Sequence, residues 1–216
     1  MVSASGSNAL SQDLLTESRE YAREILIGLN ASPSHFHAVN YCKSILAQNG
    51  FIELKEAGQW SIEKGKGYYF TRNGSTICAF LTGNKCGTEP VHHFKIVGCH
   101  TDSPVLKIAP RSKRSAQGFN QINVLTYGGG LWRTWFDRDL SLAGKVIVKD
   151  HATNKLTAHY WNAARPLMKV PSLAIHLDRS EEFKPNKEVH LKPILATAVV
   201  NELFGEGVTA INEDTF

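Results

Sequence analysis

The sequence predicts an α/β region followed by a β-rich region, with the boundary near residue 107. Helical periodicity of apolar residues extends as far as Gly50. Strand patterns then replace it, starting with two runs that flank Asn73-Gly74. Beyond Pro104 the predicted strands are short and are separated by frequent Gly and Pro residues, which is typical of β-rich domains.

Composition excludes several classes of protein. The chain has 216 residues, 42% of them hydrophobic and 20% charged, as in a soluble globular protein. Its net charge of +4 is too small to indicate a nucleic-acid partner. No apolar run reaches the roughly 18 residues of a membrane span, and the first residues do not resemble a secretory signal. The four cysteines form no CxxC pair and are expected to be reduced thiols. We therefore expect a cytoplasmic protein that binds neither nucleic acid nor membranes.

Two helices are predicted before the first strand. The first carries charged residues opposite an apolar stripe and ends at residues 30–33. Ser32 is expected to cap the second helix, with Pro33 in its first position, where a proline loses no hydrogen bond. Gly50 is expected to end this helix. The apolar stripe of the first helix comprises Leu14, Tyr21, Ala22, Ile25 and Leu29, and the stripe of the second, which is expected to be buried, comprises Val39, Cys42, Ile45 and Leu46.

The strands of the first region form a hairpin and a buried run. Asn73-Gly74 is the strongest two-residue hairpin signal, and it joins residues 67–72 to residues 75–81. Phe94–Cys99 is an apolar run with β-branched residues, which predicts a buried strand. This strand would lead directly into His100.

The second region is predicted to contain more strands and one helix. Residues 105–108 and 122–125 are short strands around a basic loop of small residues, and a turn at 150–154 joins two further strands, 145–149 and 156–161. A last helix is predicted over Pro193–Phe204, ended by Gly205.

His100 and Asp102 are the leading candidates for a functional site. Residues two apart in an extended strand point to the same face, so these side chains should lie side by side. Imidazole is a good zinc ligand, and a neighbouring carboxylate can orient it. The alternative is a structural histidine at the end of a strand, with Asp102 binding local amides. The His-x-Asp pattern is short and common, so spacing alone leaves both interpretations open.

Other motifs favour structural interpretations. Gly128–Gly130, followed by Trp132 and Trp135, suggests a turn leading into an aromatic core, and it lacks the Gly-Lys-Ser/Thr of a phosphate loop. Arg111–Arg114 is expected to be a solvated loop. Glu181-Glu182 lies in a polar stretch and is expected to face solvent.

Several ordered blocks resemble the N-terminal half of the aspartyl aminopeptidases, a family of zinc metallopeptidases. The resemblance covers nearly the whole chain. The blocks are Ser32-Pro-Ser-His-Phe-His-Ala-Val39, Tyr69-Phe-Thr-Arg-Asn73, Gly98-Cys-His-Thr-Asp-Ser-Pro104, Thr126-Tyr-Gly-Gly-Gly-Leu-Trp132, Thr134-Trp-Phe-Asp-Arg-Asp-Leu140, Ala143-Gly-Lys-Val-Ile-Val-Lys149, Pro171-Ser-Leu-Ala-Ile-His-Leu177 and His190-Leu-Lys-Pro-Ile-Leu-Ala-Thr197.

The resemblance implies a two-domain organisation and a zinc site. Residues 1–107 would be the N-terminal, incomplete portion of an α/β catalytic domain, and residues 108–216 a β-rich dimerisation domain that is itself incomplete. His100 would be a zinc ligand, and Asp102 would orient the metal site. His176 would reach into a neighbouring subunit's active site and contact substrate. Family members hold two zinc ions per active site, remove N-terminal Asp or Glu from peptides by metal-activated water, and form homo-oligomers, commonly dodecamers.

The family's remaining metal ligands and its catalytic glutamate lie in a second half that this sequence does not contain. We therefore expect a truncated chain that is inactive on its own, because a catalytic zinc usually takes three protein ligands. The alternative is a non-catalytic oligomerisation or regulatory module that co-assembles with a full-length aminopeptidase.

Overall fold

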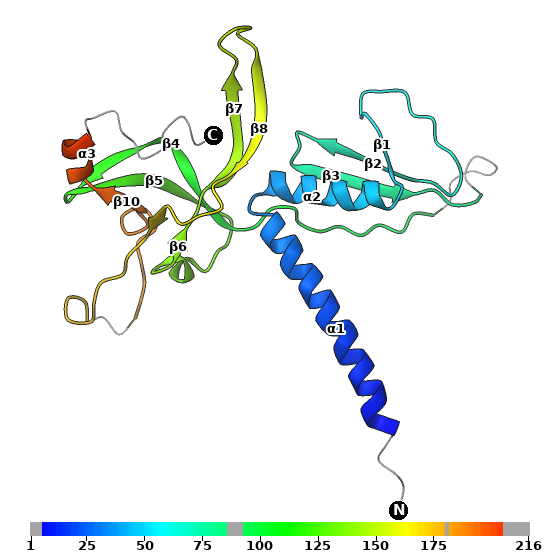
Figure 1. The fold of residues 1–216 in the computed structure, drawn as a ribbon, viewed down its shortest axis with the longest axis horizontal. Helices are drawn as coiled ribbons and strands as arrows, with labels where there is room; N and C mark the ends of the chain where they lie inside the picture. The colour runs from blue at the N-terminus through cyan, green and yellow to red at the C-terminus, as the bar shows by residue number, and fades with distance from the viewer. Residues whose placement is uncertain (1–5, 86–92, 180–181, 205–216) are drawn as a thin grey trace, which may run out of the picture. The chain divides into compact units, whose positions relative to one another are not determined.

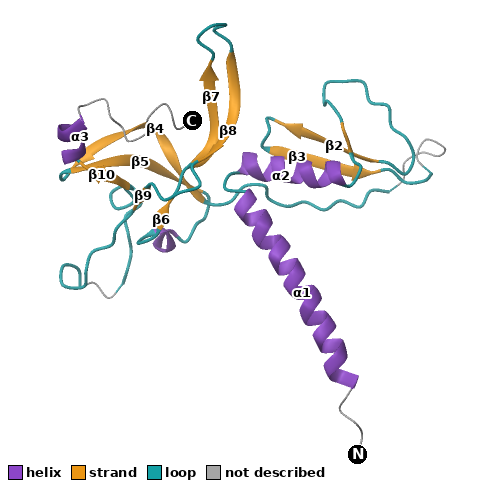
Figure 2. Ribbon diagram, in the orientation of Figure 1, coloured by secondary structure: helices purple, strands orange, loops and turns teal. Residues whose placement is uncertain are grey.

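The computed structural model of the chain describes residues 6–85, 93–179 and 182–204 (Figure 1). It is an α/β fold, with helices and three sheets in this part of the chain (Figure 2). The chain divides into two compact units: residues 1–102 with 143–161, and residues 103–142 with 162–216. The domain boundary near residue 107 stays a prediction. No helix of the described residues has both the length and the apolar character needed to cross a membrane.

The first unit begins with helices α1 (Gly6–Ala31) and α2 (His35–Gln48). The predicted end of α2 is confirmed. Gly50 has φ +77°, its amide donates to the Ala47 carbonyl at 3.0 Å, and the Phe51 amide donates to Leu46 at 3.0 Å. These two bonds satisfy carbonyls of the last helical turn, and the positive φ explains the glycine.

The predicted start of α2 is wrong by two residues. The cap is Ser34, whose Oγ accepts a hydrogen bond from the His37 amide at 3.4 Å. Pro33 lies before the helix rather than in its first turn. The sequence offers two serines either side of a proline, and the observed bond to His37 selects the later one.

A small sheet follows in the order β1 (Ile52–Glu53), β2 (Gly67–Arg72) and β3 (Thr76–Leu81). The predicted hairpin is confirmed: β2 and β3 pair antiparallel, and both residues of the Asn73-Gly74 turn have positive φ. Among the described residues of this unit, the buried hydrophobic side chains are Val39 in α2 and Tyr68 and Tyr69 in β2, so Val39 alone of the predicted α2 stripe is buried and Ile45 is exposed. The unit also contains the hairpin β7 (Ala143–Lys149) and β8 (Leu156–Asn162), with a turn between them as predicted.

The predicted buried strand at Phe94–Cys99 is not formed. The structure assigns no strand to residues 93–100, and Phe94, Ile96 and Val97 are 78%, 87% and 95% exposed. A strand requires a neighbouring strand to accept its backbone hydrogen bonds. No described segment pairs with this run, so its apolar composition alone does not bury it.

The second unit contains a five-stranded sheet in the order β4-β5-β10-β9-β6, with every pair antiparallel. Val124, Trp132, Val170 and Leu191 form its core. Trp132 belongs to a short 3-10 helix, so the interpretation of the glycine triplet as a turn into an aromatic core is confirmed. The elements are β4 (Val105–Ala116), β5 (Phe119–Tyr127), η1 (Trp132–Trp135), β6 (Asp139–Leu140), β9 (Met168–Lys169), β10 (Ile194–Thr197) and α3 (Val199–Phe204).

Two predictions for this unit are wrong. The expected basic loop is part of β4, which turns into β5 at Gln117-Gly118, both with positive φ. The expected last helix is divided into strand β10 and helix α3. Periodicity does not distinguish a short buried strand from a helix in an apolar run. Residues 194–197 form a strand because Ile194 pairs with β5 on one side and β9 on the other.

Candidate functional site

His100 and Asp102 lie side by side directly after the exposed apolar run. The His100 Nδ1 is 2.9 Å from Asp102 Oδ1. Thr101, between them, donates its hydroxyl to the Ser75 carbonyl at 2.9 Å, which ties the segment to the turn between β2 and β3. His100 and Asp102 therefore lie together, as the sequence predicts, but at a bend centred on Thr101 rather than along an extended strand.

The side chains of His100 and Asp102 differ in how far they are exposed to solvent. The His100 side chain is 91% exposed and that of Asp102 is 31% exposed. Because Nδ1 contacts the carboxylate, Nε2 is the ring nitrogen left to face a ligand. A histidine that binds metal through one nitrogen and a carboxylate through the other is a common arrangement in zinc sites.

His176 belongs to the other compact unit. It lies in a turn at 175–177, where the amides of Leu177 and Asp178 donate to the Ala174 carbonyl at 2.8 and 3.0 Å. Its side chain is exposed. The structure therefore brings together His100 and Asp102, and it assigns no geometry between that pair and His176.

The chain is similar to known aminopeptidases in sequence and in structure. Residues 28–213 match the family described as aminopeptidase I zinc metalloprotease (M18). The probable aspartyl aminopeptidase of Ricinus communis is 45% identical over 89% of this chain. A chain in the cryo-EM structure of the Ape4 and Nbr1 complex is 41% identical over 89% of this chain, with a TM-score of 0.79. The chain belongs to the M18 aminopeptidase family.

The match covers only part of each relative. This chain spans 40% of the Ricinus protein and 36% of the chain from the Ape4 and Nbr1 complex. A chain of the S. cerevisiae mApe1 dodecamer is 26% identical over 88% of this chain and 42% of its own length, with a TM-score of 0.65. Relatives of this M18 chain therefore contain a large further portion that it does not match.

The described residues do not by themselves fit a complete catalytic zinc site. A catalytic zinc ion usually takes three protein ligands. Across residues 6–85, 93–179 and 182–204, no three His, Cys, Asp or Glu side chains gather closely enough to hold a metal ion. His100 and Asp102 thus have the chemistry of one ligand and its orienting carboxylate, which is one part of such a donor set.

An aromatic cluster at the start of α2 was not predicted. Phe36 stacks on Tyr160 of β8 with ring centroids 5.6 Å apart, and the His37 ring lies 5.9 Å from the same tyrosine. Ser34 Oγ is 2.7 Å from His37 Nδ1. Burial lowers the pKa of His37 below its usual value, which favours the neutral ring. The consecutive aromatic rings of residues 35–37 were the signal available in the sequence.

Asp137 was also missed, and its role is structural. Its φ is +56°, and its carboxylate accepts hydrogen bonds from the Ser172 amide at 2.9 Å and from the Ser172 hydroxyl. These bonds hold the pKa of Asp137 below its usual range. They join the segment after η1 to the segment after β9. No local pattern in the sequence indicates this long-range pair.

Proposed function

We propose that this chain is the part of an M18 zinc aminopeptidase that contributes His100 as a metal ligand and Asp102 as the group that orients it. The observation that carries the proposal is the 2.9 Å contact between His100 Nδ1 and Asp102 Oδ1, with the imidazole 91% exposed. The carboxylate fixes the ring and raises its basicity, and Nε2 is left for the metal.

The substrate class follows from the relatives, several of which are named aspartyl aminopeptidases. The proposed reaction is hydrolysis of the first peptide bond of peptides that begin with Asp or Glu. In such sites bound zinc supplies an activated water at neutral pH. In this chain, His100 would hold the metal and Asp102 would orient His100. Two zinc ions per site are proposed by analogy with the family.

We infer that residues 1–107 belong to the catalytic domain and that residues 108–216 form a dimerisation domain. The strands of the second compact unit support this inference for residues 108–142 and 162–204, whereas residues 143–161, with β7 and β8, belong to the first compact unit. The exposed His176 would contact substrate from a neighbouring subunit. A homo-oligomer in the cytoplasm is proposed, and the dodecamer of a 26% identical relative supports assembly.

A second candidate function is a non-catalytic module that co-assembles with a longer aminopeptidase. Two observations favour it. The described residues hold no three-ligand metal group. The run Phe94–Cys99 also presents apolar side chains with no pairing strand in the described part of the chain, a surface that a partner's strand could cover.

The test is a chimera in which this chain replaces the matching stretch of the Ricinus relative. Zinc-loaded chimera should release Asp from the N-terminus of a peptide, and a chelator should stop the release. His100→Asn should lower kcat/KM by about a thousandfold or more, because it removes a metal ligand. His151→Asn, which alters an exposed histidine between β7 and β8, is the matched control and should leave kcat/KM unchanged.

The same assay distinguishes the two candidate functions. A folded, zinc-loaded chimera that leaves Asp peptides intact contradicts the aminopeptidase proposal. The module proposal instead predicts that the 216-residue chain co-purifies with the full-length relative and changes its rate. A chain that remains unassociated with that relative contradicts the module proposal.

A further inference from the structure

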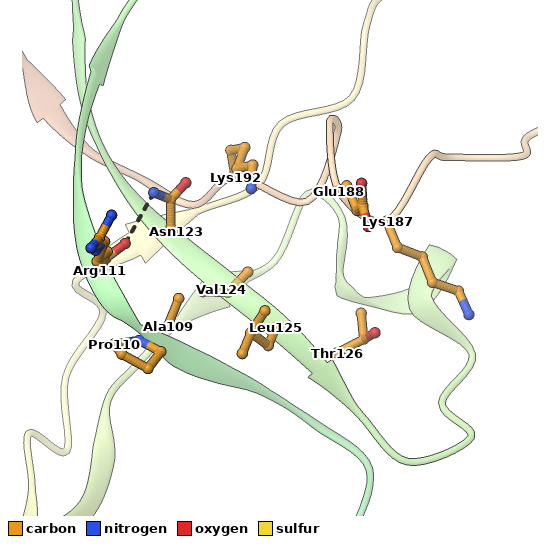
Figure 3. Close-up of a pocket in the computed structure, with 10 residues that line it drawn as sticks. All are labelled: Ala109, Pro110, Arg111, Asn123, Val124, Leu125, Thr126, Lys187, Glu188 and Lys192. Atoms are coloured by element: carbon orange, nitrogen blue, oxygen red, sulfur yellow. Dashed lines mark hydrogen bonds between the residues drawn. The ribbon is translucent and has the colours of Figure 1, made fainter.

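The second unit contains a pocket of about 670 Å³ on one side of the β4–β5 hairpin (Figure 3). Its apolar surface comes from Ala109 and Pro110 of β4 and Val124 and Leu125 of β5. Charged side chains from β4 and from the segment before β10 also line it. It therefore combines an apolar floor with charged walls.

The pocket lies where the pairing of β4 with β5 is interrupted. Ile108 pairs with Val124 and Lys113 pairs with Ile122, so the register omits residues 109–112 on β4 and Asn123 on β5. The Asn123 side-chain amide donates to the Arg111 carbonyl at 3.1 Å, which closes part of this gap. Such a bulge bends its strand and redirects side chains, here those of Ala109–Arg111.

The charges of the pocket are mostly positive. Arg111, Lys187 and Lys192 line it together with one carboxylate, Glu188, which gives three positive charges against one negative, or a net charge of +2. None of these three basic side chains forms a salt bridge with a described residue. Figure 3 shows Arg111 at one end of the pocket and Lys187 at the other, with the apolar floor between them.

We propose that this pocket binds an extended acidic peptide segment, with carboxylates at its two ends and apolar residues against the floor. A single small anion would need cations that converge on one point, whereas Arg111 and Lys187 lie at opposite ends of this pocket with Lys192 between them. Single-stranded nucleic acid is usually held by aromatic rings on which bases stack, and the described residues that line the pocket include no aromatic side chain. The inference goes beyond the proposed function, because it requires neither metal nor cleavage.

The experiment measures binding to the full chain by fluorescence anisotropy. The probe is a fluorescent, N-acetylated peptide of about six residues, with acidic residues at each end and Leu-Val between them, which spans about 20 Å when extended. Acetylation removes the free amino terminus that an aminopeptidase acts on, so the result is independent of the proposed activity. The comparison probes are the same peptide with its acidic residues replaced by amides and a single-stranded RNA.

The acidic peptide should bind, and raising the salt concentration to 1 M should weaken binding because it screens the charges. Arg111→Gln and Lys187→Gln, one at each end of the pocket, should each weaken binding about tenfold, because each removes a charged hydrogen-bond donor. Arg165→Gln removes an exposed cation of the same unit outside the pocket and should change the affinity less than about twofold. Circular dichroism of each variant checks that it is folded.

Three results would overturn the proposal. The first is equal binding of the acidic and amidated peptides, because the charges would then contribute nothing. The second is tighter binding of RNA that depends on Arg111. The third is the absence of peptide binding at millimolar concentration.

Discussion

Two apolar runs of this chain have opposite surroundings. Phe94–Cys99 resembles a buried strand in sequence, yet it forms no strand and its large side chains are exposed. Ile194–Thr197 resembles the start of a helix, yet it is strand β10, paired with β5 and β9. The difference is the presence of neighbouring strands rather than composition. An apolar run contributes to stability only through the partners that cover it.

The largest test of this comparison pairs a core residue with an exposed one. Leu191 is fully buried beside Trp132, whereas Ile96 is 87% exposed. Leu191→Ala should lower the free energy of unfolding by about 2–5 kcal/mol, because it leaves a cavity. Ile96→Ala should change it by less than about 0.5 kcal/mol. Urea unfolding followed by tryptophan fluorescence measures both. Equal losses would show that residues 94–99 are packed in solution.

A smaller effect is expected from two glycines. Gly74 has φ +66°, and the Tyr160 hydroxyl occupies the position that a Cβ would take. Gly74→Ala should therefore cost about 1–2 kcal/mol or more in unfolding free energy. Gly98 lies in the exposed run, and a Cβ there would meet no atom of the described residues within 4 Å. Gly98→Ala serves as the control in the same denaturation assay. If it were as destabilising as Gly74→Ala, the open surroundings of Gly98 would be contradicted.

A third pair of variants compares Ser34, which caps α2 with one hydrogen bond, with Ser32, which does not cap it. Ser34→Ala removes the acceptor for the His37 amide and should cost about 1 kcal/mol. Ser32 contributes no side-chain bond to the cap of α2, so Ser32→Ala should change stability by less than about 0.5 kcal/mol. Thermal unfolding of both variants measures the difference. The reverse order of effects would restore Ser32 as the cap.

The smallest expected effect depends on pH. Hydrogen bonds from Ser172 lower the pKa of Asp137 in the folded chain. A lowered folded pKa stabilises the fold above the unfolded value of about 3.9, and this stabilisation is lost as pH falls through the folded value. Asp137→Asn should therefore lower Tm at pH 7, and its difference from the unaltered chain should shrink under acid conditions. Asn tolerates the positive φ at this position.

The matched variant is Ser172→Ala, which removes the hydroxyl donor and retains the carboxylate. It should shift Tm at pH 7 in the same direction as Asp137→Asn, by a smaller amount because the Ser172 amide still donates. A Tm difference that is constant from pH 7 to acid would contradict the role of the Asp137 charge.

The sequence predicted the candidate site in part. The sequence predicted that His100 and Asp102 lie side by side, and they do, but the chain bends at Thr101 instead of forming the extended strand from which that prediction was made. The functional roles of His100, Asp102 and His176 stay predictions. The pocket that contains Arg111 and Lys192 was not predicted, because it depends on a pairing irregularity and on a segment distant in sequence.

Local chemistry determined the features that need only a few neighbouring residues. Helix α1 follows from the apolar periodicity of its own residues. The end of α2 at Gly50 and the Asn73-Gly74 turn follow from the backbone preferences of one or two residues. Tertiary structure decided the rest. Whether Phe94–Cys99, Arg111–Arg114 and Ile194–Thr197 are strand, loop or helix depends on which distant strands offer hydrogen-bonding partners. A strand, unlike a helix, satisfies its backbone hydrogen bonds outside itself, so its formation is decided by its neighbours.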